Sequence, residues 1–253
     1  AGSSLKVIGR AGAGVDNIDV KAATERGIVV LNTPGANAEG AGELAVAMMF
    51  ALARDLSRAD ATMKAGTWDK KSFNGCELRG KTLGLVGIGA VGSVVARCAA
   101  GIGMKVIAHD PFVAPDKGAA MGLRLVDLDE VIRASDFISI HSPRTEKTKG
   151  MFNRDAFARM KKGVFLVNCA RGGIVVEKDL VEALNAGIVR GAGVDVYDKE
   201  PPESWDLAKH PRVIASPHIG ASTAEAQVNV SVMIARQVGA YLTRGEIVNA
   251  VKA

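Results

Sequence analysis

Histidine is the side chain best suited to proton transfer near neutral pH, and this chain has four of them. His218 lies in the segment Pro-His-Ile-Gly, between a predicted strand at 213–215 and a predicted helix. Parallel α/β sheets bind ligands at the carboxyl ends of their strands, so His218 is the best candidate for a general acid and base. His109 and His141 are expected to be structural or to line a cofactor, and His210 lies in a polar loop.

Two charged residues follow other predicted strands in the same way. Arg171 comes after the strand at 164–167, and Glu200 after the strand at 193–196. A guanidinium group can bind a carboxylate in fork geometry, and a carboxylate beside His218 would favour the charged imidazole. We therefore expect the three side chains to converge at one edge of a sheet. Surface arginine and glutamate residues are common, so their spacing alone leaves an ordinary solvated role open.

The segment 82–110 has the pattern of a dinucleotide-binding turn. Gly87, Gly89 and Gly92 are spaced G-x-G-x-x-G after a predicted strand, and Asp110 ends the next one. Gly87 permits a tight turn, Gly89 lets a pyrophosphate approach the backbone, and Gly92 lets helix and strand pack closely. Asp110 can bind the adenosine ribose and would repel a 2′-phosphate, which favours NAD over NADP.

Other interpretations of this segment stay open. Gly87 could belong to a purely structural turn, and Asp110 could form a turn ahead of Pro111. An S-adenosylmethionine-dependent methyltransferase can carry a similar glycine turn.

A parallel sheet with crossover helices is needed to position these side chains. Short β-branched runs predict strands at 6–8, 28–31, 82–86, 105–108, 137–140, 164–167, 193–196 and 213–215. Asp19, Asn153 and Ser222 are expected to cap helices. Residues 37–65 are predicted to form one long helix. It would be either a domain-connecting or dimer-forming element, or a core helix kinked near Gly40 and Gly42.

Composition excludes several classes of protein. With 253 residues, 48% hydrophobic and 23% charged, the chain is expected to be globular, and its 4% of aromatic residues gives no stacking platform for nucleic acids. The net charge of +5 suits a small anionic substrate. The apolar run at 44–53 is too short to cross a membrane. Cys76, Cys98 and Cys169 fit neither disulfides nor a zinc site, so no metal and a cytoplasmic location are expected.

Six segments resemble the D-2-hydroxyacid dehydrogenase family, in the family's own order. They are GRAGAGVDNID (9–19), ERGIVVLNTPGAN (25–37), LRGKTLGLVGIGAVG (78–92), NCARGGIV (168–175), DVYDKEPP (195–202) and SPHIGASTAEAQ (216–227). The resemblance implies that Arg171 binds the substrate carboxylate and carbonyl. It also implies that Glu200 orients and charges the imidazole and that His218 transfers the proton.

The resemblance also implies binding residues. The expected contacts with NAD are Gly87, Gly89, Ala90, Val91, Gly92, Asp110, Ser142, Pro143, Cys169, Ala170, Asp195 and Gly220. The phosphoglycerate-specific members, which the chain resembles most, imply that the substrate anions meet Arg10, Gly12, Gly14 and Asn37. Ala90 stands where similar enzymes often have arginine, so a somewhat lower NAD affinity is expected. The implied assembly is a homodimer or a homotetramer.

The implied fold is an α/β doubly wound parallel sheet, a Rossmann-like NAD-binding domain at 36–220. Residues 1–35 and 221–253 would form a truncated, discontinuous substrate domain, since family members usually carry about half a domain before the strand at 6–8. Alternatives are a hydroxypyruvate or glyoxylate reductase, a chain that binds NAD without turnover, and a dinucleotide-sensing corepressor. Such corepressors carry a tryptophan just after the histidine, where this chain has Ala221 and Ser222.

Overall fold

The computed structural model describes residues 4–252, which form two compact units. One unit is Gly42–Ile219, and the other combines the residues up to Ala41 with those from Gly220 onward. The first boundary falls inside helix α2 (Ala38–Ala53), at 41/42 rather than at the expected 35/36.

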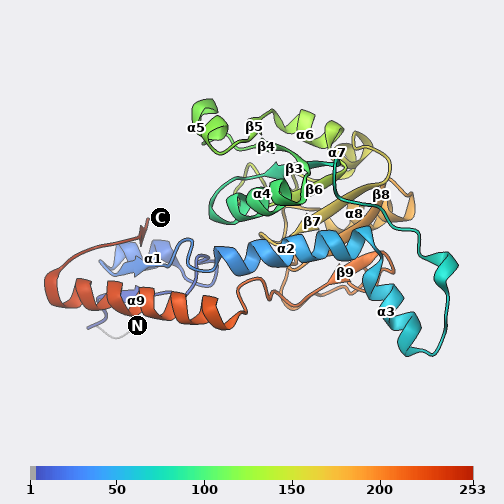
Figure 1. Cartoon of the computed structure of the whole chain (residues 1–253). Coiled ribbons are helices and arrows are strands. Elements are labelled where there is room, and N and C mark those ends of the chain that lie inside the picture. Colours follow the sequence, from blue (N-terminus) through green and yellow to red (C-terminus); the bar gives the residue numbers. More distant parts are fainter. Residues whose placement is uncertain (1–3, 253) are drawn as a thin grey trace. The chain divides into compact units, whose positions relative to one another are not determined.

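Seven parallel strands form the sheet of the Gly42–Ile219 unit, in the order β5-β4-β3-β6-β7-β8-β9 (Figure 1). They are β3 (Thr82–Val86), β4 (Lys105–His109), β5 (Arg124–Leu125), β6 (Phe137–Ile140), β7 (Val164–Asn168), β8 (Val189–Val194) and β9 (Val213–Ala215). The chain runs outward from β3 to β5 and then returns to β6 beside β3. This reversal marks the point at which doubly wound sheets bind ligands. The predicted fold class is confirmed.

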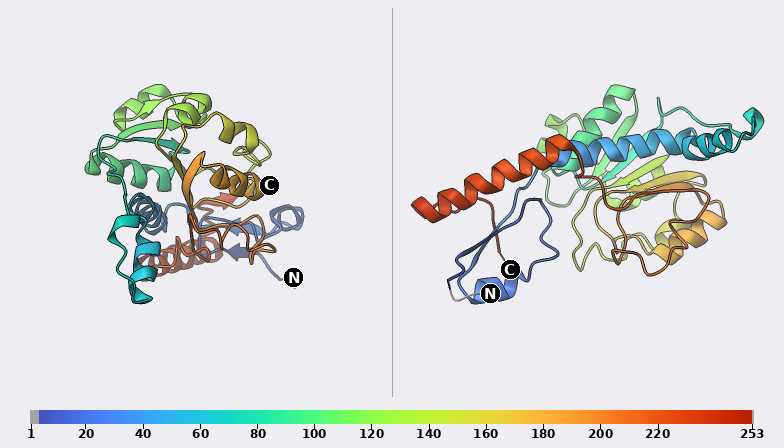
Figure 2. Two further views of the ribbon diagram at one scale, coloured as in Figure 1. Left: turned by 90° about the vertical axis from the view of Figure 1, so that its right-hand side faces the viewer. Right: turned by 90° about the horizontal axis from the view of Figure 1, so that it is seen from below.

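Helices cover both faces of this sheet (Figures 1 and 2). On one face, α2 and α4 (Ala90–Ile102) form an apolar cluster with the strands that includes Met49, Leu83 and Val95. On the other face lie α6 (Leu128–Ala134), α7 (Arg154–Ala158) and α8 (Glu177–Asn185), whose cluster includes Phe157 and Leu166. The short helix α5 (Pro115–Ala120) contacts the edge strand β5.

Strand β8 begins at Val189, earlier than the expected start at residue 193, because its glycines serve close packing rather than a turn. A Cβ on Gly193 would lie 2.9 Å from Met48 Sδ, and a Cβ on Gly191 would lie 3.1 Å from Leu52 Cδ2. Both partners belong to α2. The helix therefore packs against β8 at a distance that only glycine permits.

The prediction of a single helix at 37–65 is wrong. Helix α2 ends at Ala53, and α3 (Leu56–Lys64) follows Asp55, whose φ of 51° is left-handed and breaks the helical path. Helix α2 continues through Gly40 and Gly42, where one of the two alternatives placed a kink. A single-turn 3₁₀ helix, η1 (Lys70–Ser72), comes before the chain enters β3.

The second unit has a small three-stranded sheet. Strand β2 (Val29–Leu31) pairs in parallel with β1 (Val7–Gly9) and antiparallel with β10 (Ala250–Val251). Helix α1 (Val20–Glu25) contacts β2, and the long helix α9 (Ala224–Arg244) contacts β1 and β2. A Cβ on Gly9 would lie 2.7 Å from the Val238 side chain, so β1 and α9 pack closely.

Two of the three predicted helix caps are confirmed. Asp19 Oδ1 accepts a hydrogen bond from the Ala22 N–H at 2.8 Å, and Asn153 Oδ1 accepts one from the Ala156 N–H at 3.1 Å. The third is wrong by one residue, because Thr223 rather than Ser222 caps α9. Its Oγ1 accepts from the Ala226 N–H at 3.1 Å.

Thr223→Ala should therefore lower the free energy of unfolding by about 1 kcal/mol, the usual value of an N-cap side chain. Ser222→Ala should leave it within about 0.5 kcal/mol, as surface substitutions usually do. Urea unfolding of both variants measures the difference. A larger loss from Ser222→Ala would contradict the assignment of the cap.

Candidate active site

The structure places His218 and Glu200 in direct contact. His218 Nδ1 lies 2.6 Å from Glu200 Oε2. The other carboxylate oxygen, Oε1, accepts a hydrogen bond from the Tyr197 N–H at 3.1 Å, which fixes the carboxylate against the segment after β8. Because Nδ1 is engaged, Nε2 is the ring nitrogen available to exchange a proton with a substrate.

Buried Asp195 holds one residue on each side of His218. Its Oδ1 accepts hydrogen bonds from Ser216 Oγ at 2.6 Å and from the Ile219 N–H at 2.8 Å. His218 itself has a φ of 55°, a left-handed conformation that is uncommon for residues other than glycine. The surrounding hydrogen bonds therefore maintain a strained conformation that sets the direction of the imidazole.

Arg171 lies at the same edge of the sheet as this pair. It follows β7, as Glu200 follows β8 and His218 follows β9, and these three strands are adjacent and parallel. Arg171 Nη1 donates a hydrogen bond to the Ala170 carbonyl at 2.7 Å. The topology thus brings the three predicted catalytic residues to one edge, and direct contact is made by Glu200 and His218.

The glycine turn between β3 and α4 has the geometry that its spacing predicts. Gly87 has a φ of 92°, and a Cβ there would lie 2.8 Å from the His141 carbonyl. A Cβ on Gly92 would lie 2.2 Å from the Gly87 oxygen, whereas a Cβ on Gly89 would meet nothing within 4 Å. Helix α4 begins at Ala90 without a side-chain cap on Gly89. The first N–H groups of α4, including those of Ala90 and Val91, suit an anion at this end of the helix.

Asp110, expected to bind ribose, supports the turn itself. Its Oδ2 accepts a hydrogen bond from the Ile88 N–H at 3.0 Å, and its Oδ1 accepts one from the Phe112 N–H at 3.0 Å. The carboxylate is thereby fixed beside the glycine turn. Each oxygen keeps a second lone pair for a ligand hydroxyl, so the ribose contact stays a prediction.

Further predicted cofactor residues follow β6 and β7. Ser142, which precedes Pro143, has a buried Oγ without a hydrogen-bond partner among the described residues, so this hydroxyl is free to meet a ligand. The Cys169 thiol packs in the apolar cluster of α2, 3.7 Å from Met48 Sδ. Burial and the charge of Asp195 raise the pKa of Cys169. Only the backbone of Cys169 is therefore suited to face a polar cofactor. Ala170 is half-buried, and Gly220 is buried in the other unit.

The predicted substrate contacts Arg10, Gly12, Gly14 and Asn37 all belong to that other unit. The Gly12 N–H donates to Thr33 Oγ1 at 2.8 Å, and Arg10 Nη1 donates to the Ala11 carbonyl. Arg10 Nε is buried without a partner among the described residues. Their role toward a substrate stays a prediction.

Buried His141, beside the glycine turn, should make the stability of the fold depend on pH. Its Nε2 lies 2.8 Å from Ser139 Oγ, and burial lowers its pKa from 6.5 to about 4. Between these values the unfolded chain binds more protons than the folded one, so stability is complete above pH 6.5 and falls as the pH drops toward 4. This pKa difference of His141 is expected to account for a loss of about 3 kcal/mol in the free energy of unfolding between neutral pH and pH values below 4. Urea unfolding near neutral pH and at pH 4.5 should show a smaller pH-dependent loss for His141→Gln than for the unsubstituted chain. Equal losses would contradict the prediction.

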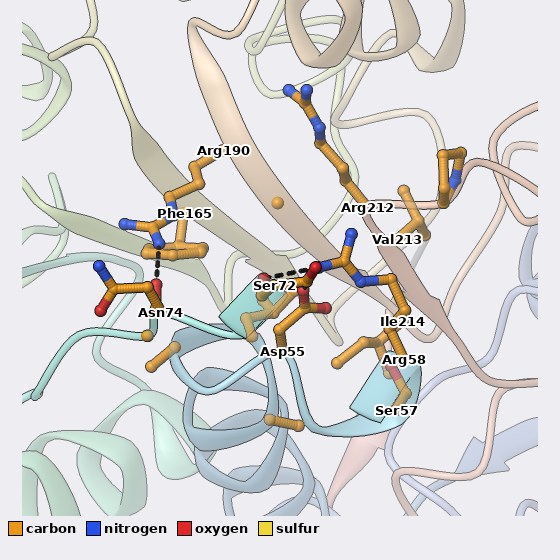
Figure 3. Close-up of a pocket in the computed structure, with 16 residues that line it drawn as sticks. Asp55, Ser57, Arg58, Ser72, Asn74, Phe165, Arg190, Arg212, Val213 and Ile214 are labelled. Atoms are coloured by element: carbon orange, nitrogen blue, oxygen red, sulfur yellow. Dashed lines mark hydrogen bonds and ion pairs between the residues drawn. The ribbon is translucent and has the colours of Figure 1, made fainter. Parts of the chain in front are cut away.

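Among the cavities of this unit, two of several hundred Å³ differ in their position relative to His218. One of about 460 Å³ adjoins His218 and is lined by apolar side chains that include Tyr197 and Trp205. The other, of about 350 Å³, lies beside the starts of β8 and β9, and Figure 3 shows Arg58 and Arg190 in its walls. They donate to the carbonyls of Ser72 and Asn74, at 3.4 Å and 2.9 Å. These guanidinium groups therefore hold the loop before β3, away from the catalytic edge.

Residues 4–252 contain no group of side chains suited to hold a metal ion. In the same part of the chain, no helix is both long enough and apolar enough to cross a membrane.

Comparisons with known proteins show similarity over most of the chain. Residues 46–220 match the family model described as the NAD binding domain of D-isomer specific 2-hydroxyacid dehydrogenases. The chain is 50% identical over 239 residues to D-3-phosphoglycerate dehydrogenase of Archaeoglobus fulgidus, covering 94% of this chain and 45% of that protein. It is 48% identical to the chloroplastic D-3-phosphoglycerate dehydrogenase 2 of Arabidopsis thaliana, covering 96% and 39%. The chain thus spans less than half the length of these curated relatives.

Solved structures give the same result. A glyoxylate reductase from Paecilomyes thermophila superposes with a TM-score of 0.91 at 36% identity, covering 98% of this chain and 76% of that one. An NAD-dependent formate dehydrogenase from Staphylococcus aureus in complex with NAD superposes with a TM-score of 0.91 at 30% identity, covering 99% and 76%.

Proposed function

The chain belongs to the D-isomer specific 2-hydroxyacid dehydrogenases, and we propose that it oxidises 3-phospho-D-glycerate to 3-phosphohydroxypyruvate with NAD. This reaction would be the first step of phosphorylated serine biosynthesis. The observation that carries the proposal is the 2.6 Å contact between His218 and Glu200 at the carboxyl edge of the sheet. The choice of substrate is supported by the identity of about one half with D-3-phosphoglycerate dehydrogenases.

Several features support NAD as the cofactor. The open space above Gly89 and the uncapped start of α4 suit the pyrophosphate, and Asp110 beside them suits the adenosine ribose. The other proposed contacts are Gly87, Ala90, Val91, Gly92, Ser142, Pro143, Cys169, Ala170, Asp195 and Gly220. When bound, NAD would supply the hydride acceptor, and the protein would supply alignment and proton transfer.

In this proposal the C2 hydroxyl proton of the substrate goes to His218 Nε2 as the hydride leaves C2. The resulting imidazolium is stabilised by the Glu200 carboxylate at Nδ1. Arg171 binds the substrate carboxylate in fork geometry, which holds C2 in place. Arg10, Gly12, Gly14 and Asn37 are proposed to bind the substrate anions.

Side-by-side assays of NADH formation with 3-phospho-D-glycerate and D-glycerate test the substrate. We expect a clear preference for the phosphorylated acid, because a basic side chain such as Arg10 gains a charge-assisted hydrogen bond to the phosphate. Equal kcat/KM values would contradict the phosphoglycerate assignment. Binding of NAD in calorimetry without turnover of either acid would indicate a chain that binds the cofactor only.

A second candidate is a reductase of glyoxylate or hydroxypyruvate. The superposition on the glyoxylate reductase, at 36% identity, favours it. NADH oxidation with glyoxylate, hydroxypyruvate and 3-phosphohydroxypyruvate distinguishes the two. Faster turnover of the unphosphorylated acids would support the reductase.

We also propose a homodimer or homotetramer and a cytoplasmic location. Light scattering of the purified chain measures the mass of the assembly, and a monomeric mass would contradict the first of these.

A further inference from the structure

Asn168, the last residue of β7, has a buried side chain with two backbone partners. Its side-chain oxygen accepts a hydrogen bond from the Ala170 N–H at 3.1 Å, and its side-chain nitrogen donates one to the Arg171 carbonyl at 3.1 Å. Its own carbonyl accepts a hydrogen bond from the Asp195 N–H at 3.0 Å. The side-chain amide therefore closes the turn that carries Arg171, and the backbone carbonyl of Asn168 links this turn to Asp195, which follows β8.

Only a short amide side chain satisfies both partners of this turn. An aspartate of the same shape can accept from the Ala170 N–H but has no donor for the Arg171 carbonyl. Alanine offers neither group, and both backbone groups would then lose a buried partner. The chemistry of the turn thus requires one donor and one acceptor on a single side chain of this length.

The turn is held on its other side as well. Gly172 packs so closely against the segment after β8 that a Cβ there would lie 1.7 Å from the backbone carbonyl oxygen of Tyr197. Arg171 Nη1 also donates to the carbonyl of Ala170, the residue whose N–H is bonded to Asn168. The backbone of Arg171 is therefore fixed between Asn168 and Tyr197, and its guanidinium is hydrogen-bonded to Ala170 within the same turn.

We propose that Asn168 is a positioning residue that sets the direction in which Arg171 meets the substrate carboxylate. The inference rests on the proposed function, because it assigns Arg171 a carboxylate to bind. A bidentate contact depends on the angle of the guanidinium plane, so loss of the amide–carbonyl bond weakens the contact while the charge of Arg171 remains. A misplacement of about 1 Å can reduce turnover by about 10²-fold.

Steady-state kinetics of Asn168→Asp and Asn168→Ala test the inference. Asn168→Asp keeps the shape of the side chain and is the variant expected to fold most like the unsubstituted chain. For both variants we expect KM for the hydroxy acid to rise about tenfold or more and kcat/KM to fall about 10- to 100-fold. For Asn168→Asp, the Kd for NAD measured by calorimetry should stay within about twofold, because the carboxylate still accepts the hydrogen bond from the Ala170 N–H next to the proposed NAD site.

Asn153→Ala is the matched control. The Asn153 side chain also accepts a hydrogen bond from a backbone N–H, which belongs to Ala156. It caps α7 and takes no part in the proposed site. Asn153→Ala should lower the melting temperature and leave KM for the hydroxy acid unchanged. A purely structural role of Asn168 predicts the same pattern, a lower melting temperature with an unchanged KM, and that result would overturn the inference.

A second set of variants tests whether Asn168 acts through Arg171. In an Arg171→Lys chain the fork geometry is already lost, so adding Asn168→Asp should change kcat/KM by less than about threefold. A full additional 10- to 100-fold loss would show that Asn168 acts by another route. If the unsubstituted chain oxidises no 2-hydroxy acid, the proposed function and this inference are both overturned. If it is active and the Asn168 variants keep its KM, only the inference fails.

Discussion

His218→Ala is expected to lower kcat for oxidation of the 2-hydroxy acid by about 10²- to 10⁴-fold, the usual contribution of a positioned acid and base. The imidazole is the group that takes the hydroxyl proton in the proposed reaction, and Glu200 engages it through Nδ1 at 2.6 Å. NAD affinity should change little, because the glycine turn and Asp110 lie in other loops. Stopped-flow measurement of NADH formation gives the rate, and calorimetry gives the Kd for NAD.

His210→Ala is the control for this substitution. His210 lies in an exposed loop, with its Nε2 3.3 Å from Asn185 Oδ1, and takes no part in the proposed site. The control should keep kcat. Comparable losses from both substitutions, or none from His218→Ala, would contradict the assignment of His218.

Glu200→Gln separates the charge of the carboxylate from its contact with the ring. The glutamine can still bond to the imidazole, but it no longer stabilises the imidazolium. The loss in kcat should therefore be smaller than for His218→Ala, and the same stopped-flow assay of NADH formation measures it.

Much of the site could be predicted from the sequence because its residues follow strands. The strands at 82–86, 137–140 and 213–215 were predicted with the bounds that the structure has, and each is a short β-branched run. Once the strands are parallel, their order along the chain brings the loops after β7, β8 and β9 to one edge. The G-x-G-x-x-G spacing likewise predicted a tight turn, and the structure has the close contacts of such a turn at Gly87 and Gly92.

Other features had no signal in the sequence. Asp55 breaks the predicted helix at 37–65 through its left-handed backbone conformation, and no glycine or proline marks this break in the sequence. The early start of β8 was missed because glycine is depleted in strands, and the reason for Gly191 and Gly193 is the approach of a distant helix. Asn168 was part of a recognisable segment, but its contribution depends on two hydrogen bonds that spacing does not reveal.

Gly89→Ala is expected to weaken NAD binding by about tenfold or more, which corresponds to at least about 1.4 kcal/mol, without loss of stability. Gly89 has a φ of −64°, which alanine adopts without strain, and its Cβ would point into open space. That space is where the pyrophosphate is proposed to approach the start of α4. Calorimetry with NAD and thermal unfolding without it measure the two effects separately.

Two neighbouring glycines provide matched controls for this prediction. Gly92→Ala places a Cβ 2.2 Å from the Gly87 oxygen, so it should lower stability by about 1 to 3 kcal/mol even without NAD. Gly101 lies in the same helix with nothing within 4 Å of its Cβ position, and Gly101→Ala should raise stability by up to about 1 kcal/mol with NAD affinity unchanged. Three identical chemical changes in one turn-and-helix segment thus have three different expected outcomes. If Gly89→Ala bound NAD as tightly as Gly101→Ala does, the pyrophosphate could not lie against Gly89, and the proposed cofactor site would be wrong.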